Sequence, residues 1–115
     1  MDMIKLKRVY DPYADSDGKR ILVDRLWPRG IKKEDARMDL WLKDIAPSDA
    51  LRKWFAHDPS RWPEFKKHYR KELEDRKEMI HELKTEARRK TVTLLFSAKD
   101  TERNNAVVLK EIIEE

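Results

Sequence analysis

Charged and polar side chains follow two apolar runs of this sequence, and their types suit the binding of an anion. Asp24 and the residues after it follow the run 20–23, while Ser97 and the residues after it follow the run 91–96. Arginine grips carboxylate or phosphate through two parallel hydrogen bonds, and a helix start offers backbone N–H donors. The candidate ligand-binding residues are Arg25, Trp27, Arg29, Ser97, Lys99, Asp100 and Asn105.

Asp24 and His57 are the candidates for acid–base catalysis. Asp24 follows a predicted strand, where active-site groups of α/β proteins gather, and His57 lies beside Asp58, which could orient its ring. Each residue also has a structural alternative. Asp24 could pair with a neighbouring arginine, and His57 could be a surface loop residue. Ser97 lacks the Gly-x-Ser-x-Gly elbow of a nucleophile. Whether the protein is an enzyme is therefore open.

Several kinds of site are not indicated by the sequence. It has no cysteine, and His68 and His81 lie thirteen positions apart, which is not a metal-binding spacing. Gly18 and Gly30 are its only glycines, so it has no glycine-rich phosphate loop. We therefore predict no metal and no cofactor.

The hydrophobic periodicity predicts the elements that must position these residues. Alternating or continuous apolar residues predict strands at 3–10, 20–24 and 91–97. Spacing near 3.6 predicts a helix over 33–45, with Met38, Trp41, Leu42 and Ile45 on one side. A helix capped by Ser48 follows, with Leu51, Trp54 and Phe55 inward. A long helix begins near Pro63 and kinks near Asp75, and a last helix begins after a cap at Asp100 or Thr101.

This order of elements predicts an α/β protein, a small three-layer fold with a short, mostly parallel sheet flanked by helices. We expect a single domain over 1–115, since the length suits one core. If the second and third strands are parallel neighbours, both polar clusters lie at one edge of the sheet. The connection between the first two strands is short for a parallel crossover, so an antiparallel first pair is the alternative.

The charge distribution suggests a second kind of partner. The chain carries a formal net charge of +4, and residues 61–90 hold 11 basic and 7 acidic side chains. This region could bind nucleic acid, although a solvated helix face dense in Lys, Arg and Glu is the stronger interpretation. A third hypothesis is a protein-interaction role with Trp27 and Trp62 as exposed anchors. No apolar run is long enough to cross a membrane, so we expect a cytoplasmic protein; its oligomeric state is not indicated.

Several segments together resemble the short, YeaO-like branch of the family called domain of unknown function 488. They are Tyr10-Asp11-Pro12, 18–30 (GKRILVDRLWPRG), Trp41-Leu42, Ala46-Pro47-Ser48, 51–55 (LRKWF), His57-Asp58-Pro59 and 95–100 (LFSAKD) followed by Asn105-Ala106. The resemblance implies a compact α/β domain and no established activity.

Longer members of that family read Asp-Val-Arg near the second strand and Cys-x-x-Lys-Asp at a strand end, followed by Cys-His-Arg. Lys99 and Asp100 match this pattern, but Phe96 or Ser97 stands in the place of the cysteine. Asn104-Asn105-Ala106 stands in the place of Cys-His-Arg. The resemblance therefore implies a binding pocket, or chemistry that uses other groups.

Overall fold

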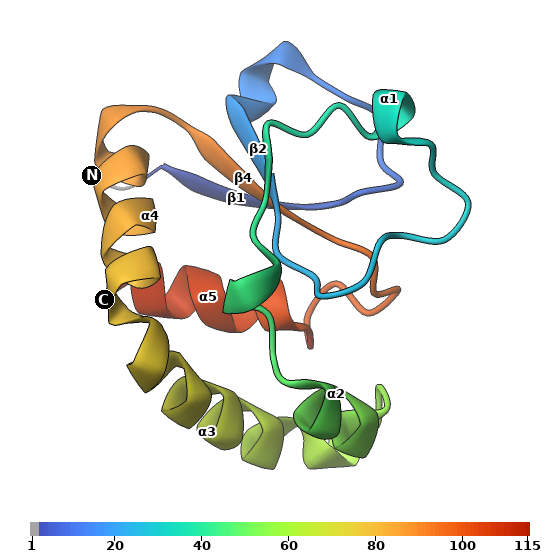
Figure 1. Cartoon of the computed structure of the whole chain (residues 1–115), viewed down its shortest axis with the longest axis vertical. Helices are drawn as coiled ribbons and strands as arrows, with labels where there is room; N and C mark the ends of the chain where they lie inside the picture. Colours follow the sequence, from blue (N-terminus) through green and yellow to red (C-terminus); the bar gives the residue numbers. More distant parts are fainter. Residues whose placement is uncertain (1–2) are drawn as a thin grey trace.

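The chain folds around a small parallel sheet (Figure 1). A computed structural model describes residues 3–115. Over that range the sheet has four strands in the order β1-β4-β2-β3, namely β1 (Ile4–Arg8), β2 (Lys19–Leu22), β3 (Leu40–Trp41) and β4 (Val92–Phe96). All neighbouring strands are parallel. The predicted α/β class is confirmed. The antiparallel alternative for the first two strands is wrong, since both pair in parallel with β4.

Five α-helices lie between and after these strands in the described range 3–115. They are α1 (Lys33–Ala36), α2 (Asp49–Phe55), α3 (Trp62–Glu72), α4 (Lys77–Arg89) and α5 (Asn105–Glu114). A 3-10 turn over Leu73–Arg76 separates α3 from α4, which confirms the kink predicted near Asp75. The Ser48 hydroxyl caps α2 as predicted, because it accepts the backbone N–H of Leu51 at 3.1 Å.

One face of the sheet carries the main hydrophobic core. α5 packs against β1 and β4, and α3 and α4 pack against α5 from outside (Figure 1). Leu94 and Phe96 of β4 meet Leu109 and Ile113 of α5 in this core. Tyr69 of α3 is fully buried, and its hydroxyl donates to the carbonyl of Ile45 at 2.6 Å. Burial raises the pKa of this phenol well above its ordinary value.

The opposite face of the sheet is covered by the segment between β2 and β3, which contains only the short helix α1. Leu22 and Leu95 form a second apolar cluster with Trp27 of this segment and Trp41 of β3. The two indole rings meet edge to face, with centroids 5.4 Å apart. This connecting segment, rather than a long helix, forms the third layer.

The amino-terminal part of this second face is polar and buried. Arg20 and Asp17 are 2% and 4% exposed and form an ion pair. Arg20 also donates to two carbonyl oxygens at the end of α1, at 2.9 and 3.1 Å. Burial alone would raise the pKa of Asp17, but hydrogen bonds from Lys7, the backbone of Ala14 and Arg20 outweigh it. The pKa of Asp17 is therefore below its ordinary value.

The single helix predicted over 33–45 is wrong. α1 ends at Ala36, Arg37 adopts a left-handed φ of 49°, and the chain continues into β3. The helical spacing gave a wrong prediction because the apolar residues of this segment pack on two different faces of the sheet. Met38 and Trp41 pack on the second face, whereas Ile45 belongs to the main core.

Gly18 allows β2 to start against Thr91. Its φ is +64°, and a Cβ there would lie 2.2 Å from the Thr91 carbonyl oxygen, which accepts the N–H of Lys19 at 2.9 Å. We expect Gly18→Ala to lower the free energy of unfolding by about 2 kcal/mol or more, because it adds a clash to a strained φ. Gly30→Ala is the control, with a φ of +80° and open space; its cost should be about 1 kcal/mol. Urea denaturation measures both, and equal losses would contradict the role of the contact.

The ionised Asp17 carboxylate should stabilise the fold in a pH-dependent way. We expect Asp17→Asn to cost about 3 kcal/mol near neutral pH, because the buried Arg20 loses its counter-charge. A carboxylate with a lowered folded pKa stabilises above the unfolded value, about 3.9, and this stabilisation is lost as pH falls through the folded value. The difference between variant and wild type should therefore shrink in acid. Glu34→Gln, on exposed α1, is the control in urea titrations at several pH values. A difference that does not change with pH would contradict this account.

Candidate functional site

Asp24, Ser97 and Asn105 come together at the carboxyl edge of the sheet. One Asp24 oxygen, Oδ2, accepts the backbone N–H of Ser97 at 2.9 Å and its hydroxyl at 2.8 Å. The other, Oδ1, accepts from Nδ2 of Asn105 at 3.2 Å. β2 and β4 are parallel neighbours, so the residues that follow them meet at one edge. The predicted convergence of the two strand ends is therefore observed.

These contacts give the Asp24 cluster a structural character. Both carboxylate oxygens of Asp24 already accept protein donors, and its backbone carbonyl accepts Nε1 of Trp41 at 2.7 Å. The Ser97 hydroxyl donates its hydrogen bond to Asp24, and the Asn105 amide also donates to the carbonyl of Val23 at 2.8 Å. The cluster ties β2, β3, β4 and α5 together.

Asn104, rather than Asp100 or Thr101, caps α5. Its side-chain oxygen accepts the N–H of Val107 at 3.0 Å, so the predicted cap is wrong. Asp100 instead closes the preceding turn by accepting the N–H groups of Glu102 and Arg103 at 2.9 and 3.0 Å. The hydrogen bond from Glu102, followed by those from Arg103, lowers the pKa of Asp100.

Arg25 and Trp27 bind neighbouring protein groups. Arg25 donates to the carbonyls of Pro47 and Ala46 at 3.1 and 3.3 Å, and so fastens the loop after β2 to the segment before α2. Trp27 is half-buried, and its N–H donates to the carbonyl of Ile31 at 2.7 Å. Both side chains therefore help to position the loop after β2 in this structure.

Arg29 and Lys99 are exposed, and their loops are joined by Arg8, the last residue of β1, and by Tyr10 just after it. The Tyr10 hydroxyl donates to the carbonyl of Arg29 at 2.8 Å, and the Arg8 guanidinium lies 4.9 Å from the Tyr10 ring centroid. Arg8 in turn donates to the carbonyls of Ala98 and Ser97 at 2.9 and 3.2 Å. Arg29 and Lys99 thus stand at the same edge of the sheet. Sequence reasoning missed Arg8 and Tyr10, although both end the first predicted strand.

His57 stands apart from this edge. It follows α2 with a left-handed φ of 57° and an exposed side chain, and its ring lies 6.3 Å from that of Phe55. Asp58 does not orient it, because that carboxylate accepts the N–H and hydroxyl of Ser60 at 3.0 and 2.7 Å. The predicted pairing of His57 with Asp58 is wrong.

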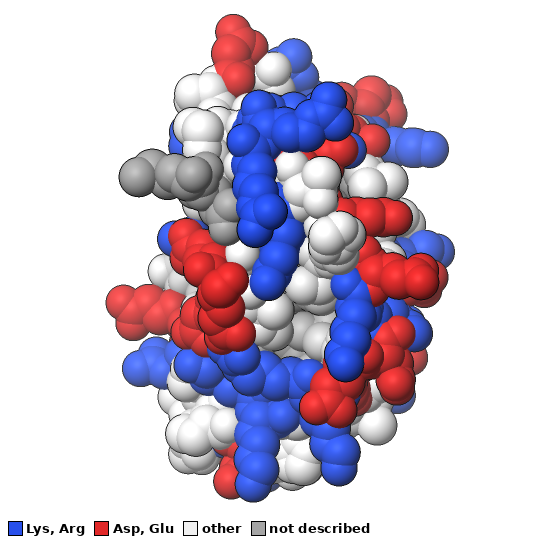
Figure 2. Space-filling model, turned by 90° about the vertical axis from the view of Figure 1, so that its left-hand side faces the viewer, with Lys and Arg blue, Asp and Glu red and all other residues white. Residues whose placement is uncertain are grey.

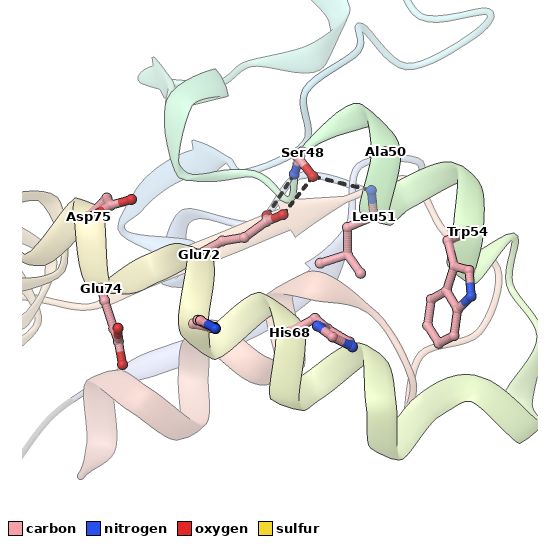
Figure 3. Close-up of a pocket in the computed structure, with 9 residues that line it drawn as sticks. Ser48, Ala50, Leu51, Trp54, His68, Glu72, Glu74 and Asp75 are labelled. Carbon is pink, nitrogen blue, oxygen red and sulfur yellow. Dashed lines mark hydrogen bonds between the residues drawn. The ribbon is translucent and has the colours of Figure 1, made fainter.

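Hollows on the surface lie away from most of the predicted site residues. An open groove of about 680 Å³ runs between α2 and α3 (Figure 3). At its centre, Glu72 accepts the N–H and hydroxyl of Ser48 at 2.9 and 2.6 Å. Trp54, predicted to point inward, is 40% exposed here beside His68, so that prediction is wrong. An adjoining groove of about 250 Å³ is lined partly by Arg25.

Residues 61–90 carry basic side chains that are partly neutralised. Lys66 pairs with Glu111 at 3.1 Å, and Arg70 pairs with Glu115 at 2.7 Å. Trp62 is half-buried against the main core. Across residues 3–115 the structure holds no cluster of His, Asp and Glu suited to a metal ion. Within the same range, no helix has the length and apolar character of a membrane span.

Comparison with known proteins shows extensive similarity. A family model described as the inactive DUF488-N3 subclade matches residues 3–115. The uncharacterized protein YeaO of Escherichia coli K12 is 48% identical over 108 residues, or 94% of each chain. The uncharacterized protein Rv3073c of Mycobacterium tuberculosis H37Rv is 40% identical over 110 residues, which are 96% of this chain and 92% of that one. No solved structure matches.

The contacts of Asp24 predict a stability role for this residue. We expect Asp24→Ala to lower the free energy of unfolding by about 2–3 kcal/mol, because the Ser97 N–H and the Asn105 amide lose a charged acceptor. Ser97→Ala should cost about 1 kcal/mol, since the backbone N–H of residue 97 keeps its bond. Urea denaturation of both variants checks this order. Unchanged stability in Asp24→Ala would mean that the carboxylate is not structural.

Proposed function

Because this chain belongs to the DUF488 family, with a match to the subclade described as inactive, we propose that it is a binding protein rather than an enzyme. Its ligand is a small anionic or nucleotide-like molecule held at the carboxyl edge of the sheet. In open α/β sheets, ligands usually bind beyond the carboxyl ends of the strands.

The observation that carries this proposal is the pair Arg29 and Lys99. Neither side chain makes a hydrogen bond or ion pair with another residue of the described range 3–115, and both are exposed. The tyrosine–arginine bridge through Tyr10 and Arg8 holds their loops on one edge. Two unpaired cations on a rigid frame suit an anionic group, which arginine can bind through two hydrogen bonds.

The neighbouring contacts support binding over catalysis. Asp24 and Ser97 bond each other and the frame around them, so neither offers a free base or nucleophile. His57 lies after α2 and has no carboxylate partner to orient it. Arg25, Trp27, Asp100 and Asn105 belong to the proposed site as the residues that position its loops.

Nucleic acid binding by residues 61–90 is the alternative, and it has less support. Lys66, Arg70 and Lys90 of this region pair with glutamates, which reduces the charge available to phosphates. Such binding would weaken steeply with salt, because phosphate contacts release counterions.

A melting experiment tests the anion site. The probes are inorganic phosphate, nucleoside mono- and diphosphates, sugar phosphates and dicarboxylates at millimolar concentration. We expect at least one probe to raise the melting midpoint. The rise should be about 4 °C for each kcal/mol by which its binding stabilises the folded protein. Arg29→Ala/Lys99→Ala should abolish the shift, whereas Lys53→Ala/Lys67→Ala, with the same loss of exposed charge, should keep it.

The outcomes separate the two partners. No shift with any probe, or an equal loss in both double variants, would contradict the anion site. Oligonucleotide binding that is lost in Arg88→Ala/Arg89→Ala/Lys90→Ala, but kept in Arg29→Ala/Lys99→Ala, would favour nucleic acid instead.

A further inference from the structure

Another groove lies on the face of the molecule that carries α4, away from the anion site. It encloses about 430 Å³ between the α3–α4 junction and the end of α5. Figure 2 shows this face, where Lys and Arg side chains stand above and below an uncharged hollow, with acidic side chains on either side.

The floor of this groove is apolar. Leu73 and Ile80 come from the α3–α4 segment and are 5% and 9% exposed, while Ile112 of α5 is half-buried beside the main core. Only the exposed edges of these aliphatic side chains are available for contact with the apolar face of an amphipathic helix.

The rim of the groove is basic along α4. Lys77, His81 and Lys84 line it with the spacing of one helix face. Lys77 and Lys84 form no hydrogen bond or close ion pair with the described residues. Lys84 does attract Glu115 electrostatically at longer range. Seven residues of α-helix separate these two ammonium-bearing positions by about 10.5 Å along the axis.

From this combination we propose that the groove docks an acidic amphipathic helix of a partner protein. Two carboxylates placed two turns apart on such a helix match the spacing of Lys77 and Lys84, and apolar residues between them meet the floor. A phosphate backbone fits less well, because it could pair with the two lysines but has no apolar side chains to contact Leu73 and Ile80. The proposal does not depend on the anion site.

A designed peptide tests this docking surface on the full chain. The probe is a fluorescent helical peptide with two glutamates two turns apart and leucines one turn from each on the same face. The matched peptide has the same composition in scrambled order. Fluorescence anisotropy measures binding to the wild type and to Lys77→Glu/Lys84→Glu. The control is Lys67→Glu/Arg89→Glu, which changes the net charge equally at exposed helix positions outside the groove.

We expect the designed peptide to bind the wild type, and to bind Lys77→Glu/Lys84→Glu about tenfold or more weakly, because attraction becomes repulsion. The control variant should bind within about twofold of the wild type, since its altered side chains do not line the groove and are screened by solvent. Melting curves establish that each variant is folded.

Other outcomes would overturn the proposal. These are the absence of binding at several hundred micromolar peptide, equal binding of the scrambled peptide, or equal weakening in both double variants. Tighter binding of an oligonucleotide that is lost only in Lys77→Glu/Lys84→Glu would assign the groove to nucleic acid. Because the groove and the anion site are separate, Arg29→Ala/Lys99→Ala should bind the designed peptide as the wild type does.

Discussion

The guanidinium group of Arg20 lies buried beneath the second face of the sheet, where each of its donors needs a partner. Asp17 supplies the counter-charge, the end of α1 supplies two carbonyl oxygens, and Asp39 accepts the backbone N–H of Arg20 at 2.8 Å. One charged residue thus fastens the crossover before β2 and the segment that leads into β3. That segment replaces a long helix as the cover of this face, and it also carries Arg29 to the carboxyl edge. The position of Arg29, in the anion site that we propose, is therefore linked through this segment to a contact at the other end of the sheet.

The sequence pattern predicted the elements whose apolar residues face one environment. The run 91–96 is apolar or β-branched throughout because β4 is central and buried on both faces, and α5 has a single buried stripe. The pattern failed over 33–45, where residues at helical spacing pack on opposite faces of the sheet. It also failed at Trp54, because hydrophobicity does not reveal that a helix has solvent on that side. The strand order could not be predicted either, since hydrophobic periodicity does not identify which strands pair.

For the candidate site, the sequence predicted that the two strand ends lie together, but it did not predict the hydrogen-bond partners of each side chain. Arg25 and Arg29 are the same residue type four positions apart. Arg25 bonds two backbone carbonyls, whereas Arg29 has none within reach of its side chain among the described residues. Only the path of the chain separates a positioning arginine from an available one. Arg8 and Tyr10 were missed for the same reason, because the place of Arg8 beside Ser97 follows from the pairing of β1 with β4, and Tyr10 contacts Arg8 and Arg29.

The position of β4 also has a consequence for how the polypeptide acquires its shape during translation. This central strand is the last of the four to be synthesised, and β1 has no other partner in the sheet. A nascent chain that ends before residue 92 therefore lacks the strand that joins β1 to β2. Such distant pairing makes the search for the native state slower than in proteins built from local contacts. Assembly of the sheet must therefore wait until residues 92–96 have left the ribosome.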